Sequence, residues 1–305
     1  MIAYLDQNKW IELAKMAHGK DKSIRAKRVL RDFEAASDGG HVDIPLSSFH
    51  YIETSRISNV DRKVRLGAVM WRFSKGATII GYAAVVRHEL EVALAKHFPR
   101  VTAGSISILG RGHSHAFGTP PLQGVLAHIE EEVERSMLIG NEVLGINPLR
   151  SHNTKYRENF REHLATLHAR QKDVPKDLRE NWLYAMSTVD ILNPINDVIH
   201  KHGLPKEALD GLGEHKLKQV IDEMPTRRVD LHLHKQVLRN PSYLARSTDL
   251  EDWGSLALAS SYCDVVVCEK HMADMLKRDG FRTHARIEVD LENTFALLMN
   301  GRGDR

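Results

Sequence analysis

The stretch Ile2-Ala3-Tyr4-Leu5-Asp6-Gln7-Asn8 passes from four mostly apolar residues to three polar ones. A short apolar run of this kind is typical of a buried strand. Asn8 is predicted to cap a helix over residues 10–17, where apolar side chains recur at helical spacing until His18-Gly19. The pattern therefore predicts a strand that leads directly into a helix, with Asp6 at the carboxyl end of the strand.

The same alternation continues along the first part of the chain. Residues 23–36 have the periodicity of a second helix, and Val42, Ile44 and Leu46 alternate as in a strand. Ser47 or Ser48 can then cap a further helix that carries Glu53.

The last sixty residues return to this order. Thr248 or Asp249 can cap a helix through Trp253, and the β-branched run from Asp264 to Cys268 predicts a strand. A helix over residues 271–277 and a final strand over 283–287 follow. Strands that alternate with helices imply a parallel sheet with helices on both faces. We therefore expect a three-layer α/β/α fold.

The middle of the chain has a different character. Helical periodicity dominates, with candidate helices at residues 85–96, 122–138, 156–170, 178–200 and 206–223. A Gly- and Ser-rich stretch over residues 104–115 predicts a long loop. We expect a core built from residues 1–80 and 246–305, divided by a large, mostly helical insertion over residues 81–245.

Length and composition exclude several classes of protein. The 305 residues and 34.6 kDa suit roughly two domains, or one domain with a large insertion. Two Cys cannot form a disulfide framework, and no secretory signal pattern is evident, so a cytoplasmic location is expected. No apolar run approaches the roughly 20 residues of a membrane span, so no membrane association is expected.

The net charge of +3 is too small to identify a partner, but charge is unevenly distributed. Residues 1–80 carry 14 Lys and Arg against 9 Asp and Glu, whereas residues 246–305 carry 8 against 11. A basic cluster from Lys20 to Arg31 could contact phosphates. Interleaved acids such as Asp21 and Asp32 favour the alternative, a solvated helix face.

Acidic side chains follow the predicted strands. Asp6 ends the first strand, Glu53 lies in the helix after the second, and Glu269 ends the late strand. Asp249 and Asp252 open the helix before that strand; for both, helix capping is the alternative role, and for Glu269 a surface position. Ligands of parallel α/β sheets bind at the carboxyl ends of the strands, so we expect these carboxylates to face one another.

Clustered carboxylates imply a cation, because like charges a few ångströms apart cannot all stay ionised alone. Oxygen-only ligation suits Mg²⁺ or Mn²⁺. Such ions lower the pKa of a bound water and neutralise charge on a phosphate. The expected chemistry is therefore hydrolysis of phosphodiester bonds.

Three segments resemble the successive acidic motifs of PIN-like nucleases, in the same order. They are Tyr4-Leu5-Asp6-Gln7-Asn8, the stretch from Ile44 to Glu53, and Asp249-Leu250-Glu251-Asp252 with the stretch from Tyr262 to Lys270. The resemblance covers residues 1–75 and 245–290. It implies an α/β/α fold in which Mg²⁺ or Mn²⁺ serves cleavage of RNA, less often DNA.

The resemblance assigns metal binding and catalysis to Asp6, Glu53 and Asp252, with Glu269 assisting. Two departures from the family pattern leave alternatives open. The usual Thr-x-Asp after the late strand is Cys268-Glu269-Lys270, and Asp249, Asp252 and Asp264 compete for the third position.

Histidines offer further candidates. Arg111, His113 and His115 lie in the Gly-rich stretch and could contact substrate phosphates, with a solvated surface loop as the alternative. His113-x-His115 and His232-x-His234 have a spacing that could bind zinc, but further ligands are not evident.

Arg227 and His232 have the Arg-x4-His spacing that resembles the motif of HEPN ribonucleases. About one such spacing is expected by chance among so many His and Arg, so the motif carries little weight.

These features together predict a metal-dependent endonuclease with single-stranded RNA as its substrate. The helical insertion is expected to shape substrate access or to contact a second copy or a partner protein. The alternative is a PIN-like module that binds nucleic acid or protein without catalysis.

Overall fold

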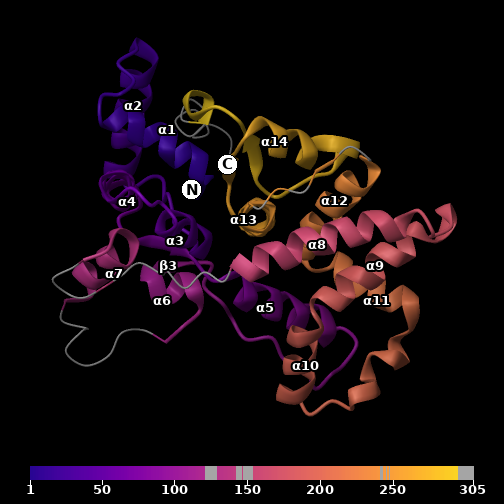
Figure 1. The fold of residues 1–305 in the computed structure, drawn as a ribbon. Helices are drawn as coiled ribbons and strands as arrows, with labels where there is room; N and C mark the ends of the chain where they lie inside the picture. Colours follow the sequence, from indigo (N-terminus) through magenta and orange to yellow (C-terminus); the bar gives the residue numbers. More distant parts are fainter. Residues whose placement is uncertain are drawn as a thin grey trace, which may run out of the picture.

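Three short parallel strands form the centre of the sheet in the computed structural model of this protein (Figure 1). They are β1 (Ala3–Leu5), β4 (Val265–Val267) and β5 (Arg286–Glu288), in the order β1-β4-β5. Tyr4 is paired with Val266, which is paired in turn with Ile287. The structure describes residues 1–120, 129–141, 146, 154–240, 243–244, 246 and 248–294.

The sheet continues on the other side of β1 through single bridges. Ile2 bridges Asp43 in parallel, and Leu46 bridges Thr78 of β2 (Ala77–Ile79) in parallel. β3 (Leu109–Arg111) pairs with β2 in the antiparallel sense. Residues 42–46, predicted as a strand, thus form only two isolated bridges, at Asp43 and at Leu46. β1 therefore has neighbours on both sides, and the carboxyl ends of β1 and β4 lie side by side, at the edge where ligands of parallel α/β sheets bind.

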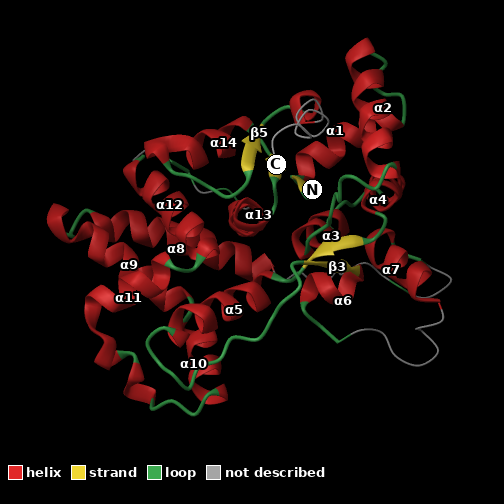
Figure 2. Cartoon of the chain, turned by 180° about the vertical axis from the view of Figure 1, so that it is seen from behind, coloured by secondary structure: helices red, strands yellow, loops and turns green. Residues whose placement is uncertain are grey.

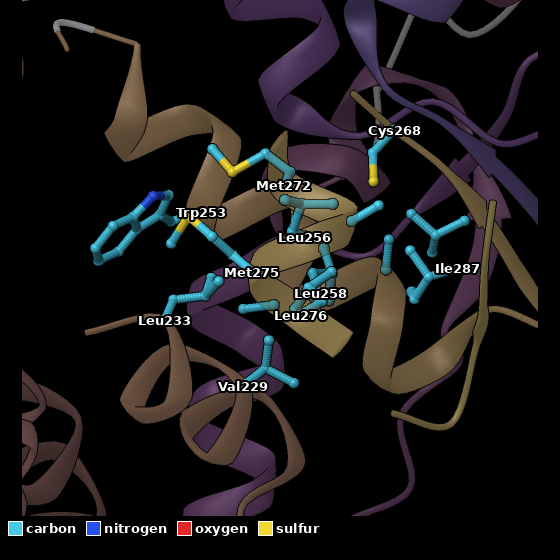
Figure 3. Packing of buried hydrophobic residues seen from close by; sticks show 14 of the residues in the cluster. Val229, Leu233, Trp253, Leu256, Leu258, Cys268, Met272, Met275, Leu276 and Ile287 are labelled. Carbon is cyan, nitrogen blue, oxygen red and sulfur yellow. The ribbon is translucent and has the colours of Figure 1, made fainter. Parts of the chain in front are cut away.

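Both faces of the sheet are covered by apolar packing. Alternate residues of a strand point to opposite faces. Leu5 and Val267 accordingly lie in one buried cluster with Trp10 and Phe33, whereas Tyr4 and Val266 lie in another. Figure 3 shows the second cluster, in which Leu256, Met272, Met275 and Leu276 lie between Trp253 and Ile287. The prediction of a mixed α/β fold is confirmed at this coarse level.

The helices that cover the sheet come from both parts of the sequence. From the first part come α1 (Gln7–Ala17), α2 (Ile24–Asp38), α3 (Ser48–Ser55) and α4 (Val60–Ser74). From the last part come α13 (Asp249–Tyr262), α14 (Lys270–Lys277) and the 3-10 turn η5 (Arg278–Gly280). Local signals explain several of the starts: the Ser23 hydroxyl accepts from the backbone N–H of Ala26 at 3.1 Å.

The middle of the chain is helical, as predicted, and most of it gathers on one side of the molecule (Figures 1 and 2). Its longer helices are α5 (Tyr82–Ala95), α8 (Thr154–Gln171), α9 (Arg179–Asp190), α10 (Leu192–Lys201), α11 (Gly213–Asp222) and α12 (Pro225–Arg239). The 3-10 turns are η2 (Lys176–Leu178), η3 (Lys206–Ala208) and η4 (Asp210–Leu212). The single helix predicted over 178–200 is wrong, because the chain breaks at Ile191 between α9 and α10.

The loop predicted over residues 104–115 is wrong in its second half. β3 is followed at once by α6 (Gly112–Phe117). Gly112 has φ +81°, a conformation that residues with a side chain rarely adopt. A Cβ at this position would also lie 2.6 Å from the Glu134 carboxyl carbon, so both the backbone conformation and the lack of space require glycine. α7 (Glu130–Ile139) packs against α3 and α4. Residues 122–128 of the helix predicted over 122–138 lie outside the described residues.

Within the described residues, no helix combines the length and the apolar character needed to cross a bilayer.

Candidate metal centre

Asp6 lies where β1 passes into α1. Its backbone N–H donates to the Val267 carbonyl at 2.9 Å, and its carboxylate accepts from the Gln7 N–H at 2.7 Å. Asp6 therefore caps α1, and the prediction that Asn8 is the cap is wrong. Only 9% of Asp6 is exposed. Burial, followed by repulsion from the nearby Glu269 carboxylate, raises the pKa of Asp6 to about 6.

Glu53 on α3 and Asp252 in the first turn of α13 face the same place. Burial raises the pKa of Glu53 well above its usual range, and the next largest causes are the charges of Asp252 and Asp6. Burial and the charge of Asp6 raise the pKa of Asp252 to about 7. The charge of Asp6 thus acts on both other carboxylates, and that of Asp252 acts on Glu53, as expected for like charges held together out of water.

A close approach of α3 and α13 helps to bring Glu53 and Asp252 together. A Cβ at Gly254 would lie 2.5 Å from the ring of Phe49. Glycine at this position of α13 therefore leaves the space that the α3 side chain needs.

Glu269 completes the acidic group from the end of β4. It stands at the N-cap position of α14, and its carboxylate accepts a hydrogen bond from the Asn8 amide at 2.6 Å. Asp6, Glu53, Asp252 and Glu269 thus come together from four separate segments.

These acids border an open cleft of about 470 Å³, which Glu53, Asp252 and Glu269 line directly. The cleft also has a basic wall. The arginines that line it are Arg56, Arg62, Arg157 and Arg246.

Two of the arginines are held in place by Glu251, a residue to which the sequence analysis gave no role. Arg157 of α8 donates from Nε to both Glu251 oxygens at 2.8 and 3.0 Å, and Arg56 lies 2.8 Å from the same carboxylate. The helical middle of the chain therefore contributes a side chain to the cleft.

Two competing acids lie elsewhere. Asp249 is fully buried, and its carboxylate accepts from the Tyr243 hydroxyl at 2.8 Å and from the Arg246 backbone at 2.7 Å. Asp264 precedes β4, at the opposite end of the strand, and accepts from the Ile2 N–H at 2.7 Å. Both carboxylates hold the fold together, which leaves Asp252 as the third acid of the cleft.

The structure does not bring Arg111, His113 or His115 to the acids. Arg111 donates to the Lys75 carbonyl at 2.7 Å. The ring nitrogens of His115 contact the Thr78 hydroxyl at 2.8 Å and the Ser107 carbonyl at 3.1 Å. His113 stacks on Phe117 with ring centroids 4.3 Å apart. These contacts lie around β2, β3 and α6, so the three side chains support local structure.

The Arg-x4-His pair is not assembled either. Arg227 is buried on α12 beside Asp190 and Asp230. His232 stacks on Phe281, and its Nε2 lies 2.9 Å from the Met275 carbonyl oxygen.

Comparison of the chain with known proteins identified no relative. No family model, no curated protein and no solved structure matches the chain. What the cleft can bind therefore has to follow from its own side chains.

The donor set of the cleft fits a hard divalent cation. Its charged ligands are all carboxylate oxygens, which suit Mg²⁺ or Mn²⁺. The structure describes one group of three side chains whose ligating atoms lie within 4.8 Å of one another. It lies apart from the cleft and consists of His163, Asp190 and His234. Among the described residues, the acids of the cleft do not form such a close group, so an ion bound there would have to retain several waters.

Proposed function

We propose that this protein is a metal-dependent nuclease that cuts single-stranded RNA. The observation that carries the proposal is the grouping of Asp6, Glu53 and Asp252 beside an open cleft: these carboxylates come from distant segments, Asp6 raises the pKa of the other two, and Asp252 raises that of Glu53. Such perturbed groups in a cleft are typical of functional sites. A divalent cation is the partner that removes their repulsion.

The side chains divide into three roles. Asp6, Glu53 and Asp252 would hold Mg²⁺ or Mn²⁺, with Glu269 assisting. When bound, such an ion supplies an activated water at neutral pH and stabilises charge on a phosphate. Asn8 orients Glu269 through its amide, and Glu251 fixes Arg157 at the rim. Arg62, which lines the cleft, would bind phosphate oxygens, whereas Arg246 is paired with Asp249 at 3.2 Å and lies 3.8 Å from Asp252.

A basic groove supports a polyanionic substrate. Ile11 and Arg62 line both the acidic cleft and a neighbouring groove of about 360 Å³. The other charged or titratable side chains that line this groove are Lys15, His18, Lys20 and Arg65, all basic. Cleft and groove together form a path along which a negatively charged chain can reach the acids.

The burial of the acids favours a single strand. Asp6 and Glu53 are largely covered by protein, so a scissile phosphate has to enter the cleft to approach them. A flexible single strand can bend into such a site, whereas a duplex presents a rigid backbone.

The proposal is tested by incubating the purified full chain with labelled single-stranded RNA, single-stranded DNA and duplex RNA in Mn²⁺ or Mg²⁺, beside EDTA controls. We expect cleavage of single-stranded RNA only when the metal is present. Binding without shortened products, or affinity that EDTA does not change, would instead identify a binding module. Preferential cleavage of DNA or duplex RNA would overturn the proposed substrate.

Lys15→Glu should weaken substrate binding without slowing the chemical step. Lys15 is exposed on α1 and lines the basic groove, away from the acids. We expect KM for RNA to rise about tenfold with kcat nearly unchanged, and the slope of log affinity against log salt to fall by about 0.7 for one lost phosphate contact. Steady-state kinetics at several salt concentrations measure both quantities.

Lys216→Glu is the matched control for this prediction, since it makes the same charge change at an exposed position of α11. Equal effects of the two variants would mean that only net charge matters and that the groove is not the RNA path.

A further inference from the structure

A second group of ligating side chains lies apart from the acidic cleft, among the helices of the middle of the chain. His163 comes from α8, Asp190 from the end of α9 and His234 from α12. One ligand atom from each lies within 4.8 Å of the other two. The Nε2 atom of His163 is 3.9 Å from the Asp190 carboxylate, too far for a hydrogen bond. The three ligand atoms thus lie close together, while no hydrogen bond joins His163 to Asp190.

Two observations indicate that this group of side chains suits a cation. His163 Nε2 is buried and has no hydrogen-bond partner, although buried polar atoms are nearly always satisfied. The His234 ring is held through Nδ1, which lies 3.0 Å from the Asp230 carbonyl oxygen and 3.4 Å from the Asp230 carboxylate. A carboxylate behind the imidazole is the usual support of a metal-binding histidine.

The net charge of the surrounding side chains is compatible with a bound divalent ion. Asp190 and Asp230 carry two negative charges, and Arg227 contacts both carboxylates, at 3.2 and 3.0 Å. One negative charge therefore remains when both histidines are neutral. The rival way to balance it is a proton on His234, which the Asp230 carboxylate would also favour.

The donor types identify the class of ion. Two imidazoles and one carboxylate form a set that Zn²⁺ prefers, whereas Mg²⁺ seeks oxygen ligands. We infer that His163, Asp190 and His234 form a zinc site that fastens α8 to α9 and α12, with water in the fourth position.

The position of the site on α8 explains what such a clamp would do. Among the described side chains of α8, those in the buried apolar cluster are Phe160, Leu164 and Leu167. The same helix carries Arg157, which reaches the acidic cleft and binds Glu251. A zinc ion at His163 would fix the helix less than two turns from Arg157. The acids of the cleft play no part in this inference.

The inference is tested on the full chain by measuring bound zinc after dialysis against excess Zn²⁺ and then against buffer, together with the melting temperature in Zn²⁺ or Mg²⁺. We expect about one tightly bound zinc per chain and a rise in melting temperature of several degrees with Zn²⁺ only. The His163→Gln variant should lose both the bound zinc and the rise in melting temperature.

His168→Gln is the matched control, because His168 lies on the same helix and its buried Nε2 also lacks a hydrogen-bond partner. This variant should keep the zinc, and so should Asp6→Asn, which separates the clamp from the proposed nuclease site. If His163→Gln does not fold, Asp190→Asn and the visible absorption of Co²⁺ bound to the unaltered chain provide the same test. Wild-type protein that retains no zinc, or a His163→Gln or Asp190→Asn variant that retains it fully, would overturn the inference and leave a protonated His234 as the explanation.

Discussion

Asp6→Asn is expected to reduce metal-dependent RNA cleavage by about a thousandfold or more while the protein stays folded. The Asp6 carboxylate lies at the junction of β1 and α1 and shares its surroundings with Glu53, Asp252 and Glu269. Asparagine retains the oxygen that caps α1, and it caps a helix about as well as aspartate does. It removes the negative charge that a cation needs. The measurement is the single-turnover cleavage rate of labelled single-stranded RNA at saturating Mn²⁺.

The control for this experiment is Asp274→Asn, the same substitution at an exposed position of α14. It should cleave at the wild-type rate, and circular dichroism should show both variants folded. Full activity of Asp6→Asn would remove the central claim about the acidic cleft.

Without metal, the wild-type protein should be less stable at pH 8 than at pH 5, and Asp252→Asn should remove much of that difference. The folded state raises the pKa of Asp252 from 3.8 to about 7, because burial and the Asp6 charge oppose ionisation. A raised pKa in the folded state favours folding while the group is protonated, and that contribution is lost as the pH rises from about 4 through 7. A shift of this size corresponds to at most about 4 kcal/mol.

Thermal unfolding in EDTA at pH 5 and pH 8 measures this effect. We expect Asp252→Asn to raise the melting temperature at pH 8 by several degrees, with little change at pH 5. Mn²⁺ should stabilise the wild type at pH 8 and do much less for the variant, because ligand binding to the folded state is the only source of that gain. Asp274→Asn is again the control. Equal effects of Asp252→Asn at both pH values would show that repulsion among the acids does not limit stability.

The sequence predicted the elements whose signals are local. The apolar runs that became β1 and β4, and the acids that directly follow them, Asp6 and Glu269, could be placed because a strand end is defined by neighbouring residues. Glu53 lies on the helix that follows the second predicted strand, and Asp252 lies on the helix that precedes β4.

Contacts between distant segments could not be predicted in this way. Asp249 and Asp252 are three residues apart on one helix face. Their roles differ because the Asp249 carboxylate accepts hydrogen bonds from Tyr243 and Arg246. Glu251 gains its position from arginines that lie far away in the sequence.

The histidines illustrate the same limit. The spacing rule singled out His232 with His234, but residues two apart on α12 point in different directions. The structure instead groups His234 with His163 and Asp190, which no local pattern connects.

The pairing of β1 with β4 has a consequence for protein synthesis. The Ile2 N–H donates to the carboxylate of Asp264, 262 residues further along the chain. At 5 to 20 residues per second, a ribosome needs roughly 15 to 50 s to cover that distance. Throughout this time Asp6 is already made, while Asp252 and Glu269 are not both available to join it. A nascent chain that ends before residue 269 therefore lacks the complete group of acids that borders the cleft.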